Sequence, residues 1–242
     1  MTKLSVSNYL ARLQTDPFDQ ASVEGLREVV ASRDPEALGE LFEQVEGLRA
    51  ILNDRTQTSV RLVLNPDHMS LQETQRAYTY LSLFGFAVDA VFVNRLLPAG
   101  VQDPFFEQWK QSQAQHLARA QELFAPLPVY EVPLRAQEVV GLANLSELAR
   151  ALYGDTDPLP PLSQEQPLEF SVVDGRYVLR LRLVGVKAAD VALERRGDEL
   201  LVELGNYRRS LTLPQYLVGL QPTWARLEGE QLVIVFDDKA KP

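Results

Sequence analysis

Residues 59–98 carry the hydrophobic pattern of a strand, then of a helix, then of a second strand. A short run of β-branched and apolar residues, "SVRLVLN", ends at the turn signal "NPD" and predicts a strand. The next apolar positions predict a helix that ends near Phe84, with Gly85 as its stop signal. "VDAVFVN" is then a nearly continuous apolar run, typical of a parallel strand covered on both faces. The segments together predict one right-handed parallel crossover unit.

Further helices and a third strand surround this unit. Apolar residues at helical spacing predict helices within residues 6–52, 103–124 and 143–153, and "LPVYEVPL" predicts a short strand within residues 127–134. Strands that alternate with helices favour an α/β fold with a parallel sheet. Three strands are few for such a sheet, so we expect its edges to need cover. The apolar members of the helix at 103–124 are Phe105, Phe106, Trp109, Leu117 and Leu123.

The pattern changes after the last of these helices. Residues 154–167, "GDTDPLPPLSQEQP", contain four prolines and no periodicity, which is typical of a semi-extended linker. Alternating runs then follow, and the Asp-Gly and Gly-Asp pairs at 174–175 and 197–198 mark hairpin turns. They predict a small antiparallel β-sandwich over residues 168–236, with leucines on one face and arginines on the other along one strand. The predicted organisation is a helical segment (1–57), a partial α/β domain (58–154), a linker (155–167) and a β-sandwich (168–238).

Composition narrows the classes of partner. The net charge of −9 and the pI near 4.9 disfavour nucleic acid and anionic membranes. The absence of cysteine excludes disulfides, thiolate zinc sites and cysteine nucleophiles. No apolar run approaches the roughly 20 residues that span a bilayer, and the first residues lack the apolar core of a signal peptide. We therefore expect a cytoplasmic protein with no nucleic-acid partner and no stable membrane insertion.

No familiar catalytic motif stands in the chain. The phosphate-binding pattern G-x-x-x-x-G-K-[ST] is absent, and so is the dinucleotide pattern G-x-G-x-x-G. His68 and His116 have no second ligand at helical spacing, so we expect no metal bound by this chain itself. Asp67 stands at a strand end, as a magnesium ligand would, but helix initiation explains it more simply. Ser70 and Glu73 have the spacing of a capping box.

Residues 58–154 resemble the arsenite-pump-driving ATPase family and its relative, the ATPase that targets tail-anchored membrane proteins. The resemblance rests on "NPDHMSLQETQR", "VNRLLP" and "VPLRAQEVVG", whose joint order is specific. Residues 168–236 are similar to the small heat-shock, α-crystallin-like domain that some bacterial members carry at the carboxyl end. There the matching stretch is "YVLRLRLVGVKAADVALERRGDELLVELGNYRRSLTLP".

The resemblance implies a P-loop fold in which an amino-terminal half supplies the phosphate-binding loop and the half seen here supplies the adenine end. Asn94, in "VNRL", matches the family's asparagine that reads the adenine edge, and an amide offers the paired donor and acceptor needed. Pro133, Leu134 and Arg135 match the loop that closes over the base. The implied ligand is ATP or ADP. The alternative for Asn94 is a turn residue at a strand end.

We therefore expect the non-catalytic, carboxyl-terminal portion of such an ATPase, which acts with a half that carries the P-loop or as a homo-oligomer. The chain alone should not hydrolyse ATP, because the catalytic parts of phosphoryl transfer are not in its sequence. The second hypothesis is a nucleotide-independent, chaperone-like adaptor that holds a protein client by adding its strand to a sheet edge. The sequence leaves both hypotheses open and does not identify a client.

Overall fold

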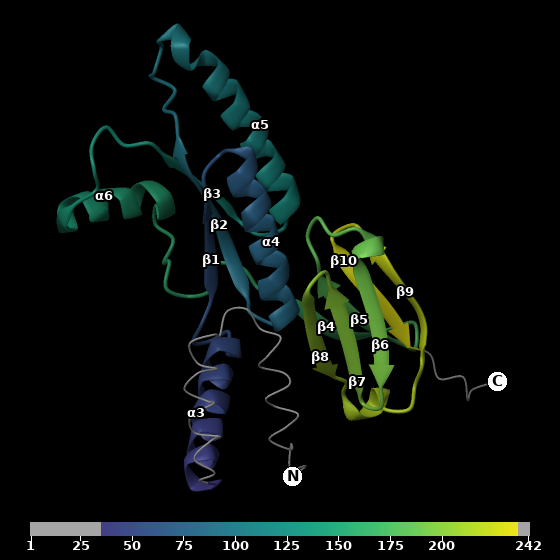
Figure 1. Cartoon of the computed structure of the whole chain (residues 1–242). Coiled ribbons are helices and arrows are strands. Elements are labelled where there is room, and N and C mark those ends of the chain that lie inside the picture. The colour runs from purple at the N-terminus through teal and green to yellow at the C-terminus, as the bar shows by residue number, and fades with distance from the viewer. Residues whose placement is uncertain (1–34, 237–242) are drawn as a thin grey trace. The chain divides into compact units, whose positions relative to one another are not determined.

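The structure is a computed structural model that describes residues 35–236 (Figure 1). The described part forms two compact units, residues 52–188 with 220–236 and residues 35–51 with 189–219. The first unit contains a parallel sheet with its helices and a four-stranded antiparallel sheet, and the second contains a three-stranded antiparallel sheet. The prediction of an α/β fold followed by an all-β region is confirmed.

The parallel sheet has the strand order β1-β2-β3, which is the order of the sequence. Right-handed crossovers between consecutive strands place α4 and α5 on the same face, and α6 lies on the opposite face (Figure 1). A short 3₁₀ helix, η1 (Pro104–Phe106), precedes α5. The bounds of the elements are β1 (Val60–Leu64), α4 (His68–Phe84), β2 (Val88–Leu96), α5 (Glu107–Phe124), β3 (Val129–Pro133) and α6 (Gly141–Tyr153).

The core of the α/β part forms where α4 and α5 pack on this sheet. The first six residues of β2 are all buried, which confirms that its apolar run is a central strand. Two of the apolar residues predicted for the helix of residues 103–124 are not part of this core: Phe105, on η1, is 72% exposed, and Trp109, on α5, is 58% exposed. They occupy the amino-terminal end of the segment, which extends past the strands (Figure 1). The buried members of the core are Leu64, Leu71, Tyr78, Val88, Val91, Val93, Ala120, Leu123, Phe124, Leu127 and Val184.

Helix α4 begins three residues earlier than the capping-box prediction requires. Asp67 is the N-cap, and its Oδ1 accepts a hydrogen bond from the Ser70 N–H at 2.8 Å. The predicted box of Ser70 and Glu73 is therefore wrong, because Ser70 lies inside the first turn and its hydroxyl accepts from the Asn65 N–H at 2.9 Å. Gly85 ends the helix with φ 86°, as expected of its stop signal.

Residues 155–167, expected as a linker, are attached to the parallel sheet by a buried carboxylate. Asp89, on β2, is 1% exposed and accepts from the Leu162 N–H at 3.0 Å. Arg61, on β1, donates to Asp89 at 3.2 Å and to the Pro158 carbonyl at 2.5 Å. A single ion pair between two strands thus holds this segment at two points.

The antiparallel sheet of the first unit has the order β4-β5-β10-β9. The predicted hairpin joins β4 to β5 through Asp174 and Gly175, whose φ angles of 51° and 77° suit a tight turn. The leucines of β5 are buried as predicted, but the arginine face is not wholly polar, since Val178 packs there with Val233, Val235 and Trp224. The bounds are β4 (Leu168–Val173), β5 (Arg176–Arg182), β9 (Pro222–Glu228) and β10 (Gln231–Phe236).

The end of β5 is docked on α4. Val184 is 1% exposed and belongs to the α/β core. Its carbonyl accepts from Thr79 Oγ1 at 2.9 Å and from Gln75 Nε2 at 3.4 Å. The next residue, Gly185, has φ 67°, and a Cβ placed on it would lie 1.5 Å from Gln75 Nε2. The sheet is therefore fastened to the α/β part through backbone and side-chain contacts.

The second unit contains a meander of three antiparallel strands in the order β6-β7-β8. Gly197, with φ 63°, lies in the predicted turn between β6 and β7. Helix α3 (Pro35–Asn53) begins in this unit and fits the helical prediction for residues 6–52, whose part before residue 35 lies outside the described residues. The remaining bounds are η2 (Ala188–Asp190), β6 (Val191–Arg196), β7 (Glu199–Leu204), β8 (Tyr207–Thr212) and η3 (Gln215–Leu217).

Candidate functional site

The residues predicted for the adenine end lie at the carboxyl ends of two neighbouring strands. Asn94 is near the end of β2, and Pro133 is the last residue of β3. Leu96 is the register partner of Pro133, and its carbonyl accepts from the Leu134 N–H at 2.7 Å. The end of β2 and the loop that begins with Leu134 and Arg135 are therefore hydrogen-bonded together. Ligands of open α/β sheets bind outside such strand ends.

Strand β2 is irregular where Asn94 stands. Its register with β3 shifts between Val93 and Leu96, and Arg95 has φ 60°, which non-glycine residues rarely adopt. Bulges and strained residues concentrate at binding sites, where they re-aim side chains. Asn94 Oδ1 accepts from the Arg95 N–H at 2.9 Å, a bond that a turn residue also makes. Among residues 35–236 its Nδ2 group donates no hydrogen bond, so it can donate to a ligand.

Gln113 on α5 holds the end of β2 in this conformation. Its Oε1 accepts from the Leu97 N–H at 2.8 Å, and its Nε2 donates to the Arg95 carbonyl at 3.4 Å. Lys110, one turn earlier, donates to the carbonyl of Val101. The sequence carries no signal for Gln113, because a glutamine on a polar helix face is common and only the fold brings it to the strand end.

An aromatic cluster lies on the α6 side of the sheet. Phe92 stacks on Tyr130 with ring centroids 4.9 Å apart and an interplanar angle of 13°, and both rings meet Tyr153 edge-on. Side chains two residues apart on a strand share a face, so Phe92 lies on the same face of β2 as Asn94. The cluster also attaches the carboxyl end of α6 to the sheet.

The loop after β3 is tied to α6 by an ion pair. Arg135 pairs with Glu147, which lies in the middle of that helix. Leu134 is 45% exposed at the start of the loop. A closing loop over a planar base would use such an exposed apolar side chain, and the ion pair limits the positions that the loop can take.

The described residues contain no gathered metal ligands. No group of three or more His, Asp or Glu side chains comes together within residues 35–236. Asp67 acts as a helix cap, as the sequence analysis favoured over a magnesium ligand. None of the helices in this part of the chain has the length and hydropathy needed to cross a bilayer.

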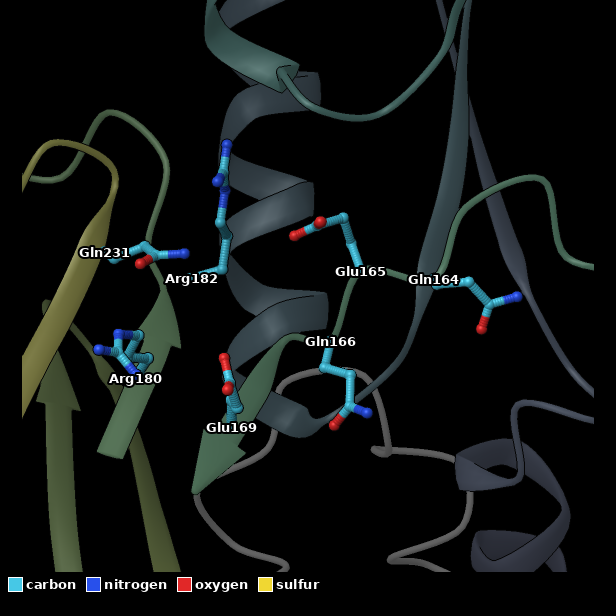
Figure 2. A pocket seen from close by; sticks show the side chains of 7 residues that line it. All are labelled: Gln164, Glu165, Gln166, Glu169, Arg180, Arg182 and Gln231. Atoms are coloured by element: carbon cyan, nitrogen blue, oxygen red, sulfur yellow. The ribbon is translucent and has the colours of Figure 1, made fainter. Parts of the chain in front are cut away.

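A polar pocket of about 250 Å³ lies between residues 164–169 and the antiparallel sheet of the first unit (Figure 2). Arg180 and Arg182 line it together with Glu165 and Glu169, so its formal charges balance. Arg180 donates to Ser171 Oγ at 2.7 Å, and Arg182 donates to the Ala125 carbonyl. A balanced pocket of this kind is a poor phosphate site, because anion sites require a net positive field. The other lining residues are Gln164, Gln166 and Gln231.

Arg182 also reaches the buried hydroxyl of Tyr78 on α4. Burial raises the pKa of Tyr78, the charge of Arg182 opposes this rise and the charge of Glu165 adds to it. The hydroxyl is therefore neutral at pH 7. The pocket residues thus contribute to the attachment between α4 and β5.

Comparison with known proteins relates both parts of the chain to one group of ATPases. A family model described as "Anion-transporting ATPase" matches residues 7–154, and one described as "HSP20-like domain found in ArsA" matches residues 174–236. The two resemblances inferred from sequence motifs are confirmed by these matches.

Individual relatives agree with the family models. "Putative arsenical pump-driving ATPase" of Chlorobaculum tepidum is 37% identical over 96% of this chain and 58% of its own length. A protein of Aquifex aeolicus with the same name, numbered 1, is 38% identical over 82% of this chain and 51% of its own length. "ATPase GET3" of Candida glabrata is 30% identical over 50% of this chain and 36% of its own length. The chain thus spans about half the length of the curated relatives it matches.

Proposed function

The chain belongs to the anion-transporting ATPase family, and from this premise we propose that it supplies the adenine end of a nucleotide site whose phosphate end lies on a P-loop half. The observation that carries the proposal is the junction of two strand ends at Asn94 and Pro133. In this proposal the Asn94 amide reads the edge of the adenine, and the loop of Leu134 and Arg135 closes over the base. ATP or ADP is the ligand.

The catalytic chemistry belongs to the P-loop half. Phosphoryl transfer needs a loop of backbone N–H groups and a lysine around the phosphates, together with a bound magnesium ion. The 242 residues contain no Gly-Lys dipeptide, so they do not supply that loop. The role of this chain is to bind the base and set its orientation, which positions the phosphates against the partner's groups.

An ATPase assay tests this division of labour. The purified chain should release no phosphate from ATP with magnesium, and the mixture with a P-loop half should do so. If instead the chain alone hydrolyses ATP with magnesium and Asn94→Ala abolishes this hydrolysis, the result contradicts the proposal, because the catalytic groups would then lie in this chain.

We also propose that the protein is cytoplasmic. Cell fractionation of the tagged protein tests this location.

A second candidate function, chaperone-like binding of a protein client, is favoured by one edge strand. Within residues 35–236, β4 pairs with β5 only, and its Val172 and Val173 are 63% and 42% exposed. An edge with exposed β-branched residues accepts an added strand. The full chain should then suppress light scattering by an aggregating client without nucleotide, and Val172→Lys should reduce the suppression. Equal suppression by both proteins would exclude this edge as the client site.

A further inference from the structure

The polar pocket of the first unit contains two carboxylates and two guanidiniums that do not pair with one another. Arg180 and Arg182 line it together with Glu165 and Glu169. The hydrogen bonds of the arginines described above go to a hydroxyl and to a backbone carbonyl. Within residues 35–236, the two carboxylates accept no hydrogen bond, and no ion pair joins either of them to an arginine. Charged groups of both signs therefore face one cavity with capacity to bind a ligand.

The strand register gathers four of the lining residues on one face of the antiparallel sheet. Glu169 is the register partner of Arg180, and Gln231 is the register partner of Arg182. Register partners point to the same face, so β4, β5 and β10 together form one wall of the pocket. Residues 164–166 border the pocket beside this wall, and in Figure 2 the carboxylate of that segment points towards β5. The backbone of the sheet thus fixes the positions of both signs of charge.

Arg182 also carries a buried donor without an acceptor. Its Nε is buried and has no hydrogen-bond partner among residues 35–236, while its Nη2 donates to the Ala125 carbonyl. Buried polar atoms of native proteins nearly always have a partner. The unpaired Nε therefore indicates an acceptor from outside the described chain, and a carboxylate is the acceptor that a guanidinium binds most strongly.

The volume and the charge of the pocket restrict the kind of ligand. Its 250 Å³ correspond to about eight waters at roughly 30 Å³ each, which fits a molecule with a similar number of non-hydrogen atoms. A pocket with a net positive field selects anions, and one with a net negative field selects cations. This pocket has equal numbers of both charges, so the matching ligand carries both charges on one small framework.

We propose that this pocket binds a small zwitterion, an α-amino acid with a short polar side chain. The ligand carboxylate binds Arg180 and Arg182, and the ammonium group binds the carboxylates of Glu165 and Glu169. The amide of Gln231 offers a donor and an acceptor to the polar side chain of the ligand. The pocket shares no residue with the adenine end, so the inference does not depend on the proposed function.

Titration of the full chain with free amino acids tests this assignment. The probes are L-serine, L-threonine and L-asparagine at concentrations up to the millimolar range. At least one of them should bind saturably in calorimetry and raise the melting temperature, because a ligand of the folded state stabilises it. Analogues that lack the ammonium or the carboxylate should bind at least about tenfold more weakly, since each loses its charge-assisted hydrogen bonds. For asparagine these analogues are succinamate and β-alaninamide.

Variants of opposite charge identify the pocket as the site. Glu169→Gln should weaken binding of the amino acid at least about tenfold and strengthen binding of the analogue without the ammonium, because the pocket becomes net positive. Arg180→Gln should instead favour the analogue without the carboxylate. The control is Glu122→Gln, which changes a carboxylate that is 69% exposed on α5 and should leave binding within about twofold.

Three results would overturn the proposal. The first is the absence of saturable binding by all three amino acids, and the second is equal binding of an amino acid and its single-charge analogues. The third is binding that Glu169→Gln leaves unchanged, because the site would then lie elsewhere. Circular dichroism first confirms that the variants fold. Glu169 is exposed on β4, so its replacement decides the test even where Arg180→Gln does not fold.

Discussion

Asp89 joins two strands to the segment that leads to the antiparallel sheet. Its carboxylate is 1% exposed and accepts from Arg61 and from the Leu162 N–H. Arg61 in turn donates to the Pro158 carbonyl. The hydrogen bonds from these partners replace the hydrogen bonds to water that the buried carboxylate has lost. Removal of the carboxylate takes these bonds away from the Arg61 guanidinium and from the Leu162 N–H.

Asp89→Ala should lower the free energy of unfolding by roughly 3 kcal/mol, since it leaves a partly buried guanidinium without its partner. Amide exchange at Leu162 should also become faster. Asp89→Asn retains two acceptor lone pairs and should cost less. Arg119→Ala is the matched control, because its ion pair with Glu122 is between side chains 57% and 69% exposed. Urea unfolding checks all three, and equal losses for Asp89→Ala and Arg119→Ala would contradict the role of Asp89.

Gln113 positions the bulge at the end of β2 by bonding to Arg95 and Leu97. Gln113→Ala should lower the free energy of unfolding by about 1 kcal/mol, because it removes one partly buried and one exposed hydrogen bond. It should also weaken ADP binding by the mixture with a P-loop half. Gln111→Ala is the control on the same helix, since the side chain of Gln111 has one hydrogen bond in the described part of the chain, to Glu107 at 3.3 Å. An effect on stability with no effect on ADP affinity would show that the bulge does not position the base.

At the scale of elements, local sequence patterns predicted the strands and helices. Tertiary contacts decided where α4 begins and which apolar side chains are buried. The continuous apolar run of β2 and the stop at Gly85 were predicted because strand burial and left-handed caps act locally. The predicted N-cap of α4 was wrong, because Asp67 and Ser70 both suit that position and only the geometry of the turn selects Asp67. Phe105 was counted among apolar helix residues, yet exposure depends on how far the helix extends past the sheet.

The docking of β5 on α4 depends on a close approach at Gly185. Gly185→Ala should destabilise the protein by about 1–3 kcal/mol, from the left-handed φ of 67° and from the clash with Gln75. Addition of Gln75→Ala should restore the steric part, with a coupling of about 0.5–2 kcal/mol in a double-mutant cycle. Gly154→Ala, at φ 57° with no atom within 4 Å, reports the backbone strain alone. Strict additivity of the Gly185 and Gln75 changes would refute the contact.

At the scale of the whole molecule, short motifs identified the family, whereas the contacts between distant segments could not be predicted from the sequence. The family and the strand-end position of Asn94 could be read from short motifs, because those motifs lie within one crossover unit and its neighbours. The roles of Gln113 and Asp89 could not be predicted in this way. Each depends on contacts between segments that are distant in the sequence.

Calorimetric titration of ADP into the mixture of this chain with a P-loop half tests the central claim most directly. The wild-type mixture should bind ADP, and Asn94→Ala should weaken the affinity at least about tenfold, because an amide that pairs with a base edge contributes roughly 1–3 kcal/mol. Gln137→Ala, which removes an exposed amide from the loop after β3, should leave the affinity unchanged. ADP binding that is equally tight in the wild type and in Asn94→Ala would contradict the assignment of the adenine end to this chain.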